Sequence, residues 1–297
     1  MRVEVILQKR SVIMSKNSTS SKAAQFQLER ILRNKILLSS KQDRAAIIDQ
    51  AYQDLFEEFP DHTRLTRTAI DAVHKGEMKA RLIIPLLKRD NKILEIGCGT
   101  GEVIAALTER GYRCTGVEVS QDMLTLCQKR GLAVIRGTAD HVDYPDGSFD
   151  VVFSQEVLEH LHPDDVLGHF AEAFRMLRPN GILAVETPNR RTGPQDVSRG
   201  FTRVAEGLHL KEWTVRELIH LFEEAGFVKV RGLLAPQFVA RRSETIHRLT
   251  RVPATIKYLQ DLLLVFVPAL RLRTIVGKIL GLDDIFLFAQ KPDNNLG

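Results

Sequence analysis

The sequence predicts an α/β fold: a doubly wound, mostly parallel seven-stranded sheet with an N-terminal helical lid and an insertion before the last strand. Two observations lead to this fold class. An apolar strand pattern, Lys92 to Ile96, runs directly into a loop with glycine at positions 97, 99 and 101, and a helical pattern follows over 102–110. Strand and helix patterns then alternate along the chain, which is typical of a parallel sheet covered by helices on both faces.

Hydrophobic periodicity places the other elements. Apolar residues between 42 and 87 recur at helical spacing and predict two or three helices that form a partial lid. Thr214 and Glu217 form a capping-box pattern, so a helix is expected to begin there and to end at Gly226. The remaining helices are expected over 121–130, 164–177 and 214–225, and the remaining strands over 113–119, 132–136, 149–154, 181–187, 228–234 and 285–290.

Charge and composition divide the chain into five segments. The 297 residues, 44% of them hydrophobic, suffice for one large core with or without a small cap. The net charge of +5 comes from two basic flanks around an acidic centre. Such flanks indicate an anionic partner, either a membrane surface or a charged substrate, or else a solvated face. The segments are a basic, disordered or loosely helical N-terminus (1–41), the lid (42–90), the core (91–235), a basic and apolar helical insertion (236–282), and the last strand with its tail (283–297).

The glycine loop is typical of a site for a nucleotide-like cofactor. Glycine lets the chain turn sharply and bring backbone N–H groups against a ligand, and the helix that follows directs its dipole toward a carboxylate or phosphate. A plain strand-to-helix turn would also use glycine. Glu118 ends the second strand about twenty residues beyond the loop, where an acid accepts both ribose hydroxyls of a nucleoside, or is simply solvated. Glu102 replaces the third glycine of the dinucleotide fingerprint, which disfavours NAD and FAD.

Several separated motifs resemble those of the class I S-adenosylmethionine-dependent methyltransferases. They are the loop Glu95-x-Gly-x-Gly-x-Gly101, the acid Glu118, and the runs Pro-Asp-Gly-Ser-Phe-Asp at 145–150 and Gln-Glu-Val-Leu-Glu-His at 155–160. The resemblance covers about residues 90–235, and it looks closest to the ubiquinone and menaquinone biosynthesis enzymes and to small-molecule O-methyltransferases. It implies a Rossmann-like fold whose last two strands pair antiparallel.

The resemblance also implies roles for individual residues. S-adenosyl-L-methionine is the expected cofactor, with Glu95 oriented toward its amino group, Glu118 holding the ribose and Gln155 contacting it through the backbone. By resemblance, Thr138 and Ala139 border the edge of the adenine. Many relatives have Asp in place of Thr138, and Asp140 is expected to supply the carboxylate that contacts the adenine amino group. Met123 lies near the adenine by resemblance, although a Met beside Leu124 is also readable as core. The expected cofactor-binding residues are Glu95, Gly97, Cys98, Gly99, Gly101, Glu118, Val119, Met123, Thr138, Ala139 and Gln155.

The methyl group of a sulfonium is already activated, so little acid or base catalysis is needed. His160 and His209 are the candidates for a base that takes a proton from a hydroxyl acceptor, and each is also readable as a structural histidine. No metal-ligand cluster is expected, because the nine histidines are scattered. Cys98 is interpreted as a packing residue of the loop and not as a nucleophile.

The acceptor is expected to be a small molecule, a lipid-linked compound or a glycan, methylated on a hydroxyl or a carbon. A loop over 188–212 is expected to overhang the methyl donor, and its arginines would contact an anionic acceptor or be solvated. Methylation of protein or RNA, or binding of the cofactor without transfer, are the alternatives. The Asn/Asp-Pro-Pro-Tyr/Phe tetrad of amino-group methylation is absent after strand 149–154. Nucleic acid is not expected, because no RNA-binding motif is recognised and only one Trp and four Tyr are available for stacking.

The insertion at 236–282 carries a short apolar run, Leu262 to Leu270, flanked by Arg271, Arg273 and Lys278. Nine residues cannot span a bilayer, which takes about 20. An interfacial helix with peripheral membrane contact, or packing against the core, remain as interpretations. Three cysteines without a C-x-x-C pair, together with no signal peptide, predict a cytoplasmic location, with any membrane contact peripheral.

Overall fold

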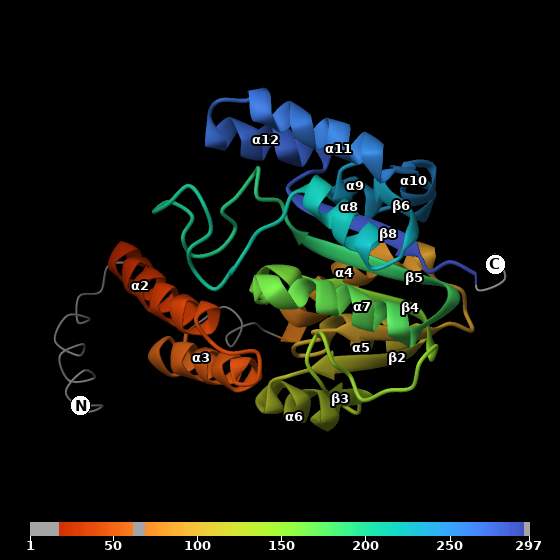
Figure 1. Ribbon diagram of the computed structural model, residues 1–297, viewed down its shortest axis with the longest axis horizontal. Coiled ribbons are helices and arrows are strands. Elements are labelled where there is room, and N and C mark those ends of the chain that lie inside the picture. The colour runs from red at the N-terminus through yellow and green to blue at the C-terminus, as the bar shows by residue number, and fades with distance from the viewer. Residues whose placement is uncertain (1–17, 62–68, 294–297) are drawn as a thin grey trace. The chain divides into compact units, whose positions relative to one another are not determined.

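The structure is a computed structural model that describes residues 18–61 and 69–293 (Figure 1). The chain forms two units, each with its own core. Of the described residues, 18–61 and 194–210 belong to the smaller unit, and 69–193 and 211–293 belong to the larger. Each unit is described in turn below.

The smaller unit joins two N-terminal helices to a distant loop. Helix α2 (Ser18–Leu37) and helix α3 (Arg44–Glu58) pack their apolar faces with Leu208 and Leu210 of the loop. Glu29 of α2 is buried and accepts a hydrogen bond from the backbone N–H of Leu208 at 3.0 Å. Arg33 donates to the carbonyl oxygen of Leu210 at 3.1 Å. Residues 194–210 are therefore fixed by hydrogen bonds and burial to α2, which no local sequence pattern indicates.

The N-terminal 61 residues differ from expectation in two ways. Residues 18–37, placed by the sequence in a disordered or loosely helical segment, form one continuous helix, while residues 1–17 of that segment lie outside the described residues. The expected lid at 42–90 is divided between the units, since α3 belongs to the smaller unit and α4 (Ala69–Ile83) to the larger. Helix α4 lies so close to the next helix that a Cβ at Gly76 would be 2.3 Å from the carbonyl oxygen of Glu102.

The larger unit is built on an eight-stranded sheet with the order β3-β2-β1-β4-β5-β8-β6-β7. The first five strands in this order are parallel, and β8 pairs antiparallel with β6, as the resemblance implies. Strand β8 also pairs antiparallel with β5. The eighth strand, β7, is a three-residue addition from the insertion that extends the expected seven-stranded edge. The strands are β1 (Lys92–Ile96), β2 (Arg113–Glu118), β3 (Val134–Arg136), β4 (Phe149–Gln155), β5 (Leu177–Pro188), β6 (Val228–Leu233), β7 (Arg251–Pro253) and β8 (Asp284–Gln290).

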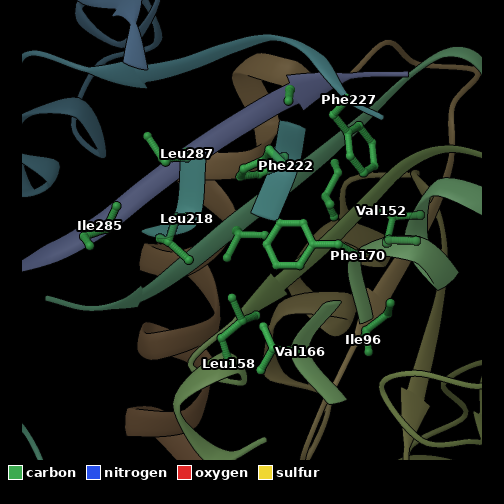
Figure 2. Close-up of a cluster of buried hydrophobic side chains, with 14 of the residues drawn as sticks. Ile96, Val152, Leu158, Val166, Phe170, Leu218, Phe222, Phe227, Ile285 and Leu287 are labelled. Carbon is green, nitrogen blue, oxygen red and sulfur yellow. The ribbon is translucent and has the colours of Figure 1, made fainter. Parts of the chain in front are cut away.

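Helices cover both faces of this sheet, and alternate residues along each strand face opposite cores. Leu94 and Ile96 face one core with α7 and α8, whereas Ile93 faces a second core with α4 and α5. Figure 2 shows Phe170 and Phe222 among side chains of the first core. The helices are α5 (Glu102–Glu109), α6 (Gln121–Lys129), α7 (Val166–Met176) and α8 (Val215–Glu224), with short turns η1 (Ile84–Leu86), η2 (Leu158–His160) and η3 (Pro163–Asp165).

Helix α8 begins as its sequence predicts. The Thr214 hydroxyl accepts from the backbone N–H of Glu217, and the Glu217 carboxylate accepts from the backbone N–H of Thr214 at 2.9 Å. Two backbone donors that a helix start leaves unpaired are thereby satisfied. The capping-box prediction is confirmed.

The insertion between β6 and β8 is mostly helical. Pro268 lies in the turn between its last two helices, so the apolar run at 262–270 is not one helix. Within the described ranges, no helix has the length and apolar character to cross a membrane. The elements of the insertion besides β7 are α9 (Gln237–Ala240), α10 (Glu244–Leu249), α11 (Ala254–Leu263), η4 (Leu264–Phe266) and α12 (Leu270–Leu280).

Truncation of a core phenylalanine should separate packing from surface effects. Phe222 is 0% exposed and contacts Phe170 edge to face at 4.9 Å between ring centroids, whereas Phe266 is 82% exposed. We expect Phe222→Ala to lower the free energy of unfolding by about 3–5 kcal/mol, because it removes buried surface and leaves a cavity. Phe266→Ala is the matched control and should change it by less than about 0.5 kcal/mol. Urea denaturation followed by circular dichroism measures both, and equal losses would contradict this account of the core.

Candidate active site

The glycine loop joins β1 to α5, and its three glycines have distinct structural reasons. Gly97, Gly99 and Gly101 all adopt left-handed φ angles, of 74°, 54° and 77°. A Cβ at Gly97 would lie 2.6 Å from Val157, and one at Gly101 would lie 2.6 Å from Leu132. At Gly99 a Cβ would meet nothing within 4 Å. Two glycines therefore allow close packing, while Gly99 alone of the three faces open space.

Glu118, at the end of β2, binds this loop directly. One carboxylate oxygen accepts from the backbone N–H of Gly99 at 2.9 Å, and the other accepts from those of Val119 and Ser120, each at 2.9 Å. The pairing of β1 with β2 brings the glycine loop next to Glu118, since the N–H of Gly97 donates to the carbonyl oxygen of Val117 at 2.8 Å. The acid predicted from its spacing thus lies against the glycine loop and is held by three donors.

Glu95 and Gln155 are buried near the ends of the adjacent strands β1 and β4, on the face that α4 covers. Burial raises the pKa of Glu95 well above its usual value, and the nearby charge of Lys79 acts in the opposite direction. Among the described residues, none donates a hydrogen bond to Glu95 Oε2 or to Gln155 Oε1. The Gln155 amide donates to Glu186 Oε2 at 2.7 Å. Two buried acceptor oxygens therefore lack a donor at the carboxyl ends of β1 and β4.

Glu156 carries an ion-pair cluster that no sequence motif indicates. It follows β4 in a left-handed conformation, with φ of 57°, and its carboxylate lies 2.8 Å from the Lys79 ammonium and 3.2 Å from that of Lys75. Burial alone would raise the pKa of Glu156, but the two lysines hold it below its usual value. Strain at a non-glycine residue of this kind often marks a functional site. The lysines come from α4, far from Glu156 in sequence, so no local pattern could have revealed the cluster.

The network extends from β5 into the insertion. Arg241, which follows α9, donates both to Glu186 and, at 3.0 Å, to Gln237. Glu186 lies beside Gln155 in the sheet register. A buried carboxylate thus connects the end of β4 to the insertion.

The segment after β3 is held by a buried histidine on α7. His169 is fully buried, which lowers its pKa to about 4, so the neutral ring has one N–H donor. Nδ1 lies 3.1 Å from the carbonyl oxygen of Ala139, which only accepts, so Nε2 must accept from the Ser154 hydroxyl at 3.1 Å. The Thr138 hydroxyl donates to Asp140 Oδ1 at 2.9 Å, which places the two residues expected at the adenine edge together.

Met123, Cys98 and the two candidate bases are placed as follows. Met123 is half-buried on α6, whereas Cys98 is buried in the glycine loop. A hydrogen bond with Cys127, together with burial, raises the pKa of the Cys98 thiol, so it stays protonated. His160 ends η2, just beyond β4 in the larger unit. His209 belongs to the smaller unit, next to the Leu208 that binds Glu29.

The arginine-rich loop at 188–212 is divided between the units. Arg190 pairs with Glu217 at 3.2 Å, and Arg191 pairs with the buried Asp261 at 2.7 Å, so both take part in the fold of the larger unit. Arg199 and Arg203 belong to the smaller unit. The loop thus consists of two segments with separate packing, and its position over the methyl donor stays a prediction.

Comparisons with known proteins agree with this geometry. Residues 94–185 match the family model described as a methyltransferase domain. A probable S-adenosylmethionine-dependent methyltransferase of Mycolicibacterium smegmatis is 33% identical over 137 residues, which cover 46% of this chain and 51% of the relative. A phthiotriol/phenolphthiotriol dimycocerosates methyltransferase of Mycobacterium leprae is 34% identical over 127 residues, 39% of this chain and 45% of the relative. The chain thus aligns with about half the length of these relatives.

A solved structure shows the same fold. The S-adenosylmethionine-dependent methyltransferase from Archaeoglobus fulgidus superposes with a TM-score of 0.51 at 21% identity, and the match covers 81% of this chain and all 100% of that one. The sheet order, the glycine loop and the family match agree with one another. Residues 94–185 therefore match a methyltransferase domain in sequence, and they lie within a unit that has the fold of an S-adenosylmethionine-dependent methyltransferase.

Proposed function

We propose that this chain transfers a methyl group from S-adenosyl-L-methionine to a hydroxyl, or to a carbon, of a small-molecule or lipid-linked acceptor. The observation that carries the proposal is the Glu118 carboxylate, which three backbone N–H groups hold at the glycine loop, next to the open space where a Cβ of residue 99 would meet nothing within 4 Å. The two oxygens of a carboxylate accept about four hydrogen bonds in total. Three are already made, so one acceptor position is left for a ribose hydroxyl.

The chain's residues fit this cofactor in chemistry as well as in place. The unpaired, buried Oε2 of Glu95 suits the ammonium of the methionine part, because a buried acceptor without a donor is costly until a ligand supplies one. The carbonyl of Ala139, fixed by His169, borders the adenine in this proposal, with Thr138 and Asp140 next to it. Met123 is half-buried, which leaves part of its side chain available to the adenine.

When bound, the cofactor supplies an activated methyl group on a sulfonium, and the protein's part is to align the acceptor and to exclude water. Ser154 and Gln155 at the end of β4, with Glu156 and Val157 after it, stand in place of an amino-group methylation tetrad, which favours an oxygen or carbon acceptor. His160, at the end of η2 beyond β4, is the base that we assign to a hydroxyl acceptor, with His209 as the second candidate.

The acceptor class is supported from two sides. The relative from Mycobacterium leprae is named for a dimycocerosate, and the insertion at 236–282 exposes apolar side chains at the surface of the larger unit. Both support a lipid-linked acceptor and peripheral contact of the insertion with a membrane. The alternative acceptor is a free small molecule, and the methyl-transfer experiment described below distinguishes it from a lipid-linked acceptor.

The open face of Gly99 has a direct test. Gly99→Val should weaken binding of S-adenosylhomocysteine by about tenfold or more, because the side chain would enter the space proposed for the cofactor. Gly131→Val is the matched control: Gly131 also has a left-handed φ, of 73°, and a Cβ there would likewise meet nothing within 4 Å. Both variants should lose similar stability through backbone strain. Calorimetric titration at a temperature where both are folded measures the affinities, and equal affinities would remove Gly99 from the site.

Proton release should accompany cofactor binding through Glu95. Burial raises the pKa of Glu95 in the unliganded chain, whereas the ligand's ammonium would stabilise the carboxylate and lower that pKa. Up to about one proton should therefore leave on binding, and affinity should increase with pH until the unliganded pKa is passed. Lys79 lowers this pKa, and Glu102 and Cys127 raise it.

Calorimetry in two buffers with different ionisation enthalpies measures the released proton. Glu95→Gln should abolish the release and weaken binding, while Glu109→Gln, an exposed residue at the end of α5, should leave both unchanged. If wild type and Glu95→Gln released the same number of protons, the assignment of Glu95 to the ammonium would be wrong.

Methyl transfer itself should be seen with labelled cofactor and fractionated lysate. We expect label in an organic-solvent extract for a lipid-linked acceptor, or in the aqueous small-molecule fraction otherwise, with the product identified by mass. His160→Ala or His209→Ala should lower turnover by about a hundredfold at saturating cofactor without loss of S-adenosylhomocysteine binding. Unchanged turnover in both would discard the base. Cofactor binding without any transfer would identify a non-catalytic module, and label in protein or RNA would identify a macromolecular acceptor.

A further inference from the structure

A helical hairpin in the insertion exposes an unusual amount of apolar surface. Helices α11 and α12, joined by η4, form the outer edge of the larger unit in Figure 1. Soluble proteins rarely expose apolar patches this extensive without a partner. The exposed apolar side chains of the hairpin are Ile256, Leu259, Leu263, Val265, Phe266, Leu270, Leu272, Ile275 and Ile279.

We propose that this hairpin, residues 254–280, is a docking surface for an anionic lipid bilayer, with both helices lying in the plane of the membrane interface. The inference extends the proposed function, because it names where a membrane is engaged, but it does not depend on methyl transfer. The orientation of each helix, its charges and its length each support the proposal.

The orientation of α11 is set by charged residues on its inner face. Lys257 is buried and donates to the carbonyl oxygens of Leu280 and Gly281, at 3.2 and 2.7 Å, which end α12. Asp261, one helical turn later, is fully buried and accepts from Asn189 at 2.9 Å and from Arg191 at 2.7 Å. These bonds cannot form if the helix is rotated. The opposite face, which carries Leu259 and Leu263, must therefore point outward.

The orientation of α12 is set by small residues. A Cβ at Gly277 would lie 2.5 Å from the Thr192 side chain, and the Thr274 hydroxyl donates to the carbonyl of Thr192 at 3.1 Å. At about 100° per residue, Leu272, Ile275 and Ile279 lie within a narrow arc opposite Gly277. Both helices thus hold polar or small residues inward and a line of leucine and isoleucine outward.

The charges around the apolar face are all positive. Arg271 and Lys278 are exposed on α12, one side of its apolar line. Asp261 is the only acid between residues 245 and 282, and it is buried. The exposed surface of the hairpin therefore has cations without acids, which favours an anionic bilayer. A second copy of the chain is disfavoured as the occupant, because self-association would bring like charges together.

The length of the helices fits an interfacial position. Helix α11 has 10 residues and α12 has 11, so neither approaches the length that spans a bilayer, about 20 residues. The bond from Asn189 to Asp261 attaches the hairpin to the carboxyl end of β5. The glycine loop lies at the same edge of the sheet, since β5, β4 and β1 are parallel. A docked hairpin would thus place that edge near the membrane surface.

Flotation with phosphatidylcholine vesicles, with and without phosphatidylglycerol, tests the proposal on the full-length chain. Wild type should float with the anionic vesicles, and less so as salt is added. The triple variant Leu272→Ser, Ile275→Ser, Ile279→Ser should reduce vesicle binding by about tenfold or more. The double variant Arg271→Glu, Lys278→Glu should reduce binding to the anionic vesicles most strongly.

A matched triple variant, Leu126→Ser, Val228→Ser, Leu234→Ser, replaces three apolar residues that are also exposed, but outside the hairpin. It should bind vesicles as wild type does. Circular dichroism and S-adenosylhomocysteine binding check that all variants are folded.

No flotation of wild type, or equal flotation of both triple variants, would overturn the proposal. So would a wild-type dimer in sedimentation equilibrium that the hairpin triple variant dissociates, because the face would then be a contact between copies. Vesicle binding without any cofactor binding would overturn the proposed function and leave this inference intact.

Discussion

The candidate site depends on one carboxylate and three backbone N–H groups. Glu118 accepts from Gly99 in the glycine loop, and from Val119 and Ser120 at the start of α6. Hydrogen bonds to an ionised acceptor are about twice as strong as neutral ones, so this single side chain fixes the loop after β1, the end of β2 and the first turn of α6 relative to one another. Because Glu118 binds the N–H of Gly99, the open space at Gly99 has a defined position.

Buried polar groups carry the site's structure away from the glycine loop. Glu95, Gln155 and Glu186 lie on the α4 face of adjacent strands, and each costs free energy unless it is paired. Glu186 is paired with Gln155 and Arg241, while one oxygen each of Glu95 and Gln155 has no donor within the described part of the chain. In the proposed function, the bonded groups have a structural role, and a ligand would supply the donor to the unpaired oxygen of Glu95. Hydrogen bonds from Gln155 and Arg241 to Glu186 thus connect the carboxyl end of β4 to the insertion.

Local patterns predicted the fold well, and long-range pairing limited the prediction of the site. The strands of the sheet lie within a few residues of their expected bounds because apolar runs and glycine turns are local signals, and the capping box at Thr214 is confirmed for the same reason. The ion pairs of Glu156 with Lys75 and Lys79 join residues about eighty positions apart, and the packing of Leu208 on α2 joins residues still further apart. No periodicity encodes such contacts. Strand β7, with three residues and a proline, is too short for a sequence pattern to indicate it.

Helix α11 buries charged side chains and exposes apolar ones. Burial lowers the pKa of Lys257 to about 8, and Asp261 is buried beside it on the helix, so the fold bears the desolvation cost of two charges. Leucine and isoleucine on the same helix, which would gain free energy from that burial, instead face solvent. In water, these outward side chains contribute no free energy of burial. The arrangement is favourable only if the outward face is buried elsewhere, and the exposed cations of α12 indicate that the surface which buries it is negatively charged.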